Sequence, residues 1–110
     1  MEFDRHTLVL LRWPEGMRRF SADELERSQS GHLAYLARMY EAGHLAVSGP
    51  FDDQEDASLR GVSLYRTSLE ETRRLVQEDP AVQMGRLEPV LQVWLVPRDR
   101  RISVGPSDGS

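Results

Sequence analysis

The sequence contains no cysteine among its 110 residues, and all fourteen of its basic residues are arginines. Without cysteine, the chain has no disulfides, no thiolate metal ligands and no cysteine nucleophile. Without lysine, it has no lysine amine to form a Schiff base with a carbonyl substrate. No stretch approaches the ~20 consecutive apolar residues that a transmembrane helix needs. These absences narrow the chemistry available to the chain more than any single motif does.

The remaining composition is typical of a soluble globular domain, with 39% hydrophobic and 29% charged residues. A formal net charge of −4 makes nucleic acid and anionic membranes unlikely partners. The first residues lack the basic and apolar regions of a signal peptide, so we expect a cytoplasmic protein. The length predicts one domain over residues 1–98, followed by a flexible C-terminal tail over residues 99–110.

Two Ser-x-x-Glu capping boxes, at residues 21–24 and 68–71, predict the starts of two helices. The first helix is expected to reach about Ala42, with Gly43 in the left-handed conformation that often follows a helix. The second is expected to end before Pro80, because the residue before a proline resists helical geometry. The acidic, turn-rich segment 51–58 is predicted to be a loop.

Four short stretches of apolar and β-branched residues are predicted to be strands. They cover residues 7–13, 45–48, 61–66 and 86–96. With the two helices, the order is β-α-β-β-α-β, which predicts an α+β protein with a ferredoxin-like fold and a four-stranded antiparallel sheet. In that fold both helices cover the same face of the sheet.

The other face of the sheet is predicted to be covered by a second copy of the chain. In the first strand Val9 and Leu11 point to one face, while Leu8 and Leu10 point to the other. The last strand is also apolar on both faces, and such strands are usually buried on both faces. Because soluble monomers rarely expose so large an apolar patch, we expect a homodimer packed sheet against sheet.

His32 is the most informative residue of the first helix. The predicted inward stripe of that helix consists of Leu25, Gln29, His32, Leu36 and Met39. A histidine on this stripe is either a packed core residue with one satisfied hydrogen bond or a group that lines a cavity. A rigid helix position is what a general acid or base needs.

Asp79 is the second candidate, and it also has two readings. Asp followed by Pro80 is typical of a helix start, with Asp as N-cap and Pro as the first helical residue. Alternatively, Asp79 accepts a hydrogen bond from one imidazole nitrogen of His32, which would make the other nitrogen more basic. The two roles are compatible, because a carboxylate has several acceptor sites.

The segment Ser48-Gly49-Pro50 is either an ordinary turn or part of a binding site. In the second case Gly49 allows close approach of a bound molecule and Ser48 offers a hydroxyl. With Leu36 of the first helix, these three residues are the predicted substrate-binding residues. Arg12 is either a clamp for a carboxylate or an exposed arginine at the edge of a strand. The spacing of histidines and acids predicts no metal site, and no glycine-rich phosphate loop or other cofactor motif occurs.

Taken together, the order of these residues resembles the YciI-like (YCII-related) family over residues 7–98. The resemblance is carried by His32-Leu33 in the first helix, Gly43 followed by Leu45, Gly49-Pro50, Gly61 opening the third strand, and Asp79-Pro80 after the second helix. It implies a fold of the dimeric α+β barrel type, with His32 and Asp79 matching the family's candidate catalytic pair. Ser48 stands where a small apolar residue is usual, and the loop 51–58 is unusually acidic.

The resemblance implies a small, cofactor-independent enzyme, since one characterised relative is a dehydrochlorinase and similar barrels include muconolactone isomerases. His32 and Asp79 would catalyse elimination, isomerisation or cyclisation of a small cyclic or aromatic oxygenated metabolite. The alternative is a non-catalytic module that binds or senses a small molecule. A third possibility is a cofactor-less monooxygenase.

Overall fold

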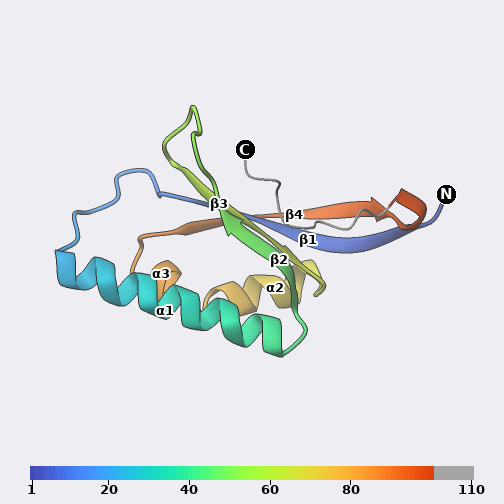
Figure 1. Cartoon of the computed structure of the whole chain (residues 1–110), viewed down its shortest axis with the longest axis horizontal. Coiled ribbons are helices and arrows are strands. Elements are labelled where there is room, and N and C mark those ends of the chain that lie inside the picture. Colours follow the sequence, from blue (N-terminus) through green and yellow to red (C-terminus); the bar gives the residue numbers. More distant parts are fainter. Residues whose placement is uncertain (101–110) are drawn as a thin grey trace, which may run out of the picture.

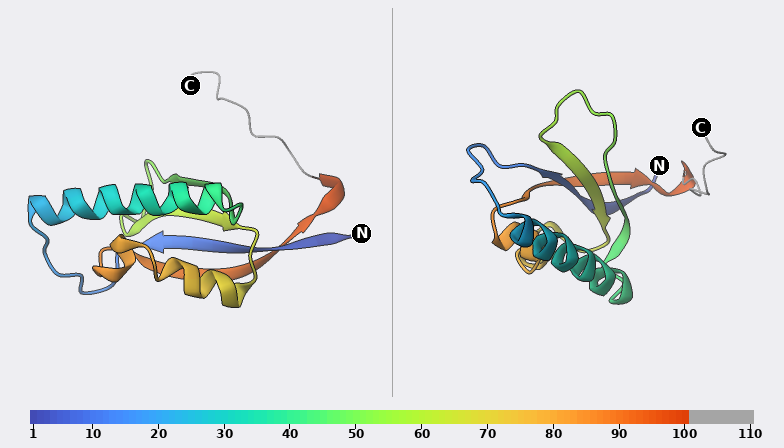
Figure 2. Two further views of the ribbon diagram at one scale, coloured as in Figure 1. Left: turned by 90° about the horizontal axis from the view of Figure 1, so that it is seen from below. Right: turned by 60° about the vertical axis from the view of Figure 1, so that its left-hand side comes forward.

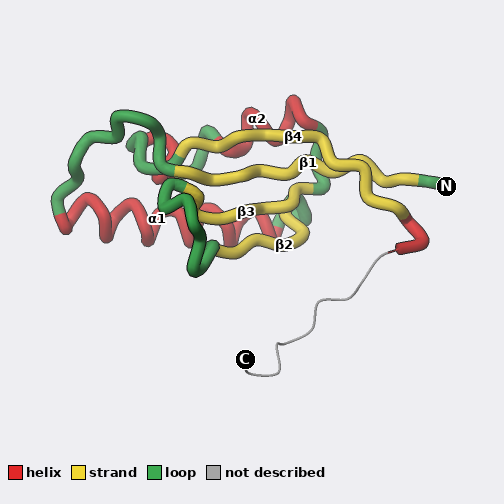
Figure 3. Tube along the Cα trace, turned by 90° about the horizontal axis from the view of Figure 1, so that it is seen from above, coloured by secondary structure: helices red, strands yellow, loops and turns green. Residues whose placement is uncertain are grey.

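The structure, a computed structural model that describes residues 1–100, consists of a four-stranded antiparallel sheet with all its α-helices on one face (Figure 1). The strands are β1 (Phe3–Arg12), β2 (Leu45–Pro50), β3 (Leu59–Tyr65) and β4 (Glu88–Pro97). The helices are α1 (Ala22–Glu41), α2 (Leu69–Val76) and the short α3 (Pro80–Gln83), and a 3-10 turn η1 (Arg98–Arg100) follows β4. The strand order is β2-β3-β1-β4 (Figure 3), which is the ferredoxin-like order and confirms the predicted fold class.

All four strands extend past their predicted ranges at one end, and β3 begins at Leu59 rather than at residue 61. The central strand β1 pairs with β4 from Phe3 opposite Pro97 to Arg12 opposite Glu88. At the ends of both strands the side-chain pattern does not predict a strand, but the backbone hydrogen bonds of this pairing extend the strands there. Strand β2 likewise continues through Gly49-Pro50, which the sequence predicted to close it. Of the predicted tail 99–110, the first two residues belong to η1 and the rest lies outside the described residues.

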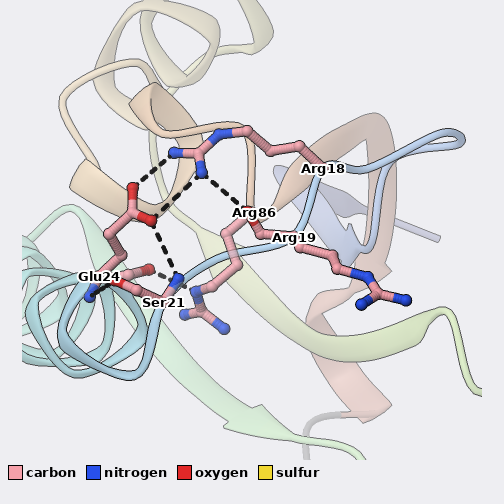
Figure 4. Close-up of polar contacts among 6 residues, drawn as sticks. Arg18, Arg19, Ser21, Glu24 and Arg86 are labelled. Carbon is pink, nitrogen blue, oxygen red and sulfur yellow. Dashed lines mark hydrogen bonds and ion pairs between the residues drawn. The ribbon is translucent and has the colours of Figure 1, made fainter.

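The helix ends follow local capping chemistry. Ser21 and Glu24 form both hydrogen bonds of the predicted capping box at the start of α1. Arg18 pairs with Glu24 at 2.8 Å (Figure 4) and lowers the pKa of that carboxyl to about 2. Gly43 has φ of +78° after α1, as predicted. At the start of α2 only half of the second box forms among the described residues: Ser68 accepts from the backbone N–H of Glu71.

The core lies between the sheet and the helices (Figure 2). Its buried side chains are Val9, Leu11, Tyr35, Met39, Leu45, Tyr65, Val76, Ala81 and Leu87. The hydroxyls of Tyr35 on α1 and Tyr65 on β3 share a hydrogen bond of 2.8 Å inside it. Burial raises the pKa of Tyr65 to about 12 and also raises the pKa of Tyr35. Both phenols are therefore neutral hydrogen-bonding groups at physiological pH.

The buried face of α1 differs in part from the predicted stripe. Leu25 and Gln29 are exposed, whereas Ser28 is fully buried. The reason is that this part of α1 packs against α3, where small residues allow a close approach. A Cβ on Gly31 would lie only 2.7 Å from Cγ of Pro80. A hydrophobic stripe cannot identify a helix face that is buried through serine and glycine.

The second face of the sheet carries no helix within the described residues (Figure 1). Its side chains are mainly apolar, namely Leu8, Leu10, Val47, Val62, Leu64, Val90 and Trp94. Val47 is 52% exposed and Trp94 49% exposed. The face is thus an apolar surface that this chain leaves open.

No helix within residues 1–100 is long and apolar enough to cross a membrane.

The close contact between Gly31 and Pro80 leads to a stability prediction. Gly31→Ala should destabilise the protein by about 1–3 kcal/mol, because the new methyl group overlaps the proline ring. This effect opposes the gain of roughly 1 kcal/mol that alanine normally brings to a helix interior. Urea denaturation measures it, with Ser30→Ala on the exposed side of α1 as a control that should be neutral or slightly stabilising. A more stable Gly31→Ala protein would show that the two helices are not packed this closely.

Candidate functional site

His32 and Asp79 meet where α1 packs against α3. Nδ1 of His32 lies 2.6 Å from Oδ2 of Asp79. The histidine side chain is 13% exposed and the aspartate side chain 3% exposed. The hydrogen bond that the sequence suggested between these two residues is therefore present, at a distance typical of a charge-assisted bond.

The second oxygen of Asp79 fulfils the other predicted role. Oδ1 accepts a hydrogen bond of 2.9 Å from the backbone N–H of Ala81, and Pro80 occupies the first turn of α3. One carboxylate thus starts a helix and contacts the imidazole at once. Because the cap fixes the position of the side chain, the imidazole is held in one orientation.

The hydrogen bond also determines which imidazole nitrogen carries the proton. An ionised carboxylate can only accept, so Nδ1 of His32 is the donor. Nε2 makes no hydrogen bond within residues 1–100, and His32 lines a cavity of about 310 Å³. In a neutral imidazole that nitrogen is an acceptor, which is the state that a general base requires.

The predicted substrate-binding residues all line this cavity. Leu36 contributes from α1, and Ser48, Gly49 and Pro50 contribute from β2. The hydroxyl of Ser48 shares a hydrogen bond of 2.9 Å with that of Tyr40. A Cβ at Gly49 would meet no atom within 4 Å, so backbone packing does not require glycine there. The structure brings these four residues together with His32, and their roles in binding stay a prediction.

Four polar residues of the cavity were missed as site residues by sequence reasoning. They are Gln29 on α1, which the sequence placed only on the inward stripe, Arg60 and Ser63 on β3, and Arg86 between α3 and β4. No local motif marks them, because each enters the site only through the packing of β3 and of the α3–β4 connection against α1. Arg12, the arginine considered from sequence, is instead exposed and pairs with Glu88 at 2.7 Å. The described residues contain no group of three or more histidine or acidic side chains that could hold a metal ion.

Comparison with known proteins places the fold among characterised ones. A family model described as YCII-related domain matches residues 11–94. Among solved structures, the chain is similar to 5-chloro-2-hydroxyhydroquinone dehydrochlorinase from Burkholderia phenoliruptrix in complex with 2,5-dihydroxybenzoquinone. The two are 20% identical with a TM-score of 0.59, and the match covers 81% of this chain and 92% of that chain. At this identity the likeness shows the fold. No curated protein matches the chain.

The geometry of the pair predicts a single imidazole tautomer. In neutral His32 the proton should reside on Nδ1, because Asp79 accepts it. Asp79→Asn should abolish this preference and cost about 1–3 kcal/mol of stability through the loss of a charged hydrogen-bond partner. Long-range ¹H–¹⁵N spectra of histidine-labelled protein report the tautomer, and Asp23→Asn in the first turn of α1 is the control. A wild-type protein with the proton on Nε2 would contradict the proposed orientation.

Proposed function

The chain belongs to the YCII-related family, and we propose that it is a small enzyme that uses His32 and Asp79 for general acid–base catalysis. The observation that carries the proposal is the 2.6 Å hydrogen bond between Nδ1 of His32 and Asp79, in a histidine that lines a cavity. A hydrogen bond from one ring nitrogen to a carboxylate fixes the orientation of the imidazole and leaves the other nitrogen facing the substrate. The arrangement matches the base and its orienting acid in other acid–base sites.

In this proposal Nε2 of His32 removes a proton from an acidic hydroxyl or C–H group of the substrate. The imidazolium that forms is stabilised by the Asp79 carboxylate, which keeps its own negative charge. The same nitrogen then returns the proton to another atom of the substrate or to a leaving group. Elimination, isomerisation and cyclisation can all proceed in this way, because none of them changes the overall redox state of substrate and product. We therefore propose a cofactor-independent reaction of one of these classes.

The size of the cavity supports a small substrate. About 310 Å³ is at the lower end of the range for small-molecule sites. Leu36 and Leu33 on α1 and Pro50 on β2 give the cavity apolar sides, which suit a ring. The structurally similar dehydrochlorinase acts on a chlorinated hydroxyhydroquinone. We propose a small cyclic or aromatic oxygenated metabolite as the substrate.

The catalytic role of His32 is tested by substitution. A panel of hydroxylated and chlorinated hydroquinones is incubated with the protein under anaerobic conditions, and products are followed by absorbance and chromatography. For any compound that is converted, His32→Ala should lower kcat by about 10²–10⁴-fold, the usual contribution of a general base. His44→Ala, at a histidine outside the cavity, is the control and should retain full turnover.

Two results would contradict the enzymatic proposal. The first is full turnover by a folded His32→Ala protein. The second is a compound of the panel that binds in the cavity and is recovered unchanged, since this is the behaviour of a binding or sensor module.

We also propose that the protein is a homodimer that covers the open face of its sheet. Val90 is 38% exposed on that face and Trp94 49% exposed, and Leu8, Leu10, Val62 and Leu64 lie beside them. An isologous contact between two such faces would bury the apolar surface of both chains.

The proposed dimer predicts a position-dependent effect of added charge. Val90→Glu should shift the protein to a monomer in sedimentation velocity experiments, because two copies of the charge would be buried in the apolar interface. Leu25→Glu, at a residue that is 46% exposed on α1, should leave the mass unchanged. A wild-type monomer, or a Val90→Glu dimer, would exclude this interface.

A further inference from the structure

Arg86 lines the same cavity as His32 and is held there by α1. Its Nε donates a hydrogen bond to Oγ of Ser28, and its Nη2 lies 3.3 Å from Oε1 of Gln29. Both acceptors are neutral groups. Figure 4 shows Arg86 together with the residues that begin α1. The guanidinium is therefore positioned by hydrogen bonds, but its positive charge is not neutralised by them.

The cavity contains a second arginine and no acid among its lining residues. Arg60 also lines it, while its guanidinium lies 4.2 Å from the centre of the Trp13 ring and donates to the carbonyl of Ala57. Neither Arg60 nor Arg86 forms an ion pair with a carboxylate of residues 1–100. In a protein with a net charge of −4, this cavity is locally positive.

The surroundings of Arg86 compensate its charge only in part. Burial lowers the pKa of Arg86, and the charge of Arg60 acts in the same direction. Asp79 acts in the opposite direction, but its oxygens already accept from His32 and Ala81. A partly buried guanidinium with unused N–H donors gains most from an anion that brings oxygen acceptors.

Ser63 supplies a further unused polar group. It is 3% exposed, lines the cavity, and its hydroxyl makes no hydrogen bond to any residue that the structure describes. On β3 it lies opposite Ser48 of β2. This hydroxyl is not a fully buried unpaired atom, since Nδ1 of His6 is the one such side-chain atom of the described residues; it is accessible to a molecule in the cavity. A ligand oxygen in the cavity would satisfy this group.

We propose that the cavity takes a small oxyanion, a carboxylate or an ionised ring hydroxyl, whose charge is bound by Arg86 and whose second oxygen is hydrogen-bonded by Ser63. This inference rests on the proposed function, because it assigns the substrate class of the site that contains His32. It makes Arg86 and Ser63 substrate-binding residues that set the preference for anionic over neutral compounds. Arg60, which also lines the cavity, adds to the positive potential there.

The test compares anions with neutral analogues of the same shape. Benzoate and benzamide form one pair, and 4-nitrophenolate and 4-nitroanisole form another. Each is titrated into the full-length protein up to about 10 mM, a range that detects weak fragment binding. We expect at least one anion to bind about tenfold more tightly than its neutral analogue, since a hydrogen bond to a charged group contributes about this much. Chemical shifts of the arginine Nε–H groups report the contact with Arg86.

Matched variants identify the residues responsible. Arg86→Gln should weaken binding of the anion about tenfold or more, whereas Arg86→Lys, which keeps the charge, should retain part of the affinity. Ser63→Ala should weaken it by a smaller factor, about threefold to tenfold. Arg73→Gln on the exposed surface of α2 is the charge-matched control and should have no effect. Melting temperatures confirm that each variant is folded.

The outcomes separate this inference from the proposed catalysis. Equal binding of anion and neutral analogue, no binding of any anion, or unchanged binding by Arg86→Gln would overturn the anion site. The catalytic proposal is judged separately, by turnover of the His32→Ala protein. A protein that binds benzoate through Arg86 but converts no compound would retain the anion site and lose the catalytic role.

Discussion

The buried carboxylate of Asp79 is the constraint on which the site depends. Its two oxygens are shared between the first N–H of α3 and the imidazole of His32. A buried charge of this kind is stable only when it is fully hydrogen-bonded. The contact with His32 requires α1 and α3 to approach closely, and the absence of a side chain at Gly31, against the ring of Pro80, makes that approach possible. Helix packing and the geometry of the candidate catalytic pair are thus one feature of the structure.

One wall of the cavity beside this pair is formed by the adjacent, antiparallel strands β2 and β3. A Cβ at Gly61 of β3 would lie 2.7 Å from the carbonyl oxygen of Gly49 on β2, so glycine lets the two backbones approach closely there. Gly49-Pro50 of β2 and Ser63 and Arg60 of β3 line the cavity together with His32. Apolar sides, one histidine and two arginines then surround a space large enough for a small ring. Strands β2 and β3 of the sheet contribute to the walls of the cavity, and α1 contributes His32.

The sequence predicted the fold well where the signals are local. The capping box at Ser21 and the left-handed Gly43 define the ends of α1, and the order of strands and helices defines the topology. It predicted the buried face of α1 only in part, because hydrophobic periodicity does not register Ser28 and Gly31. The residues alone gave the His32–Asp79 hydrogen bond as one of two readings of Asp79, and the family resemblance then favoured it, since their separation along the chain does not by itself indicate contact.

What the sequence by itself determined is therefore which chemical groups are available and the local structure that carries them: no thiol, no lysine, a histidine on a helix and an aspartate before a proline. These follow from residue identity and short-range hydrogen bonding. The tertiary structure alone decided which of these groups meet. Of the fourteen arginines, the tertiary structure brings Arg86 and Arg60 to the cavity, and it leaves Ser63 without a hydrogen-bond partner among the described residues. No local sequence pattern predicts this, because it depends on how segments far apart in the chain pack together. The sequence supplies each residue of such a site. The site itself forms only when α1, α3 and β3 pack together and bring these residues to one cavity.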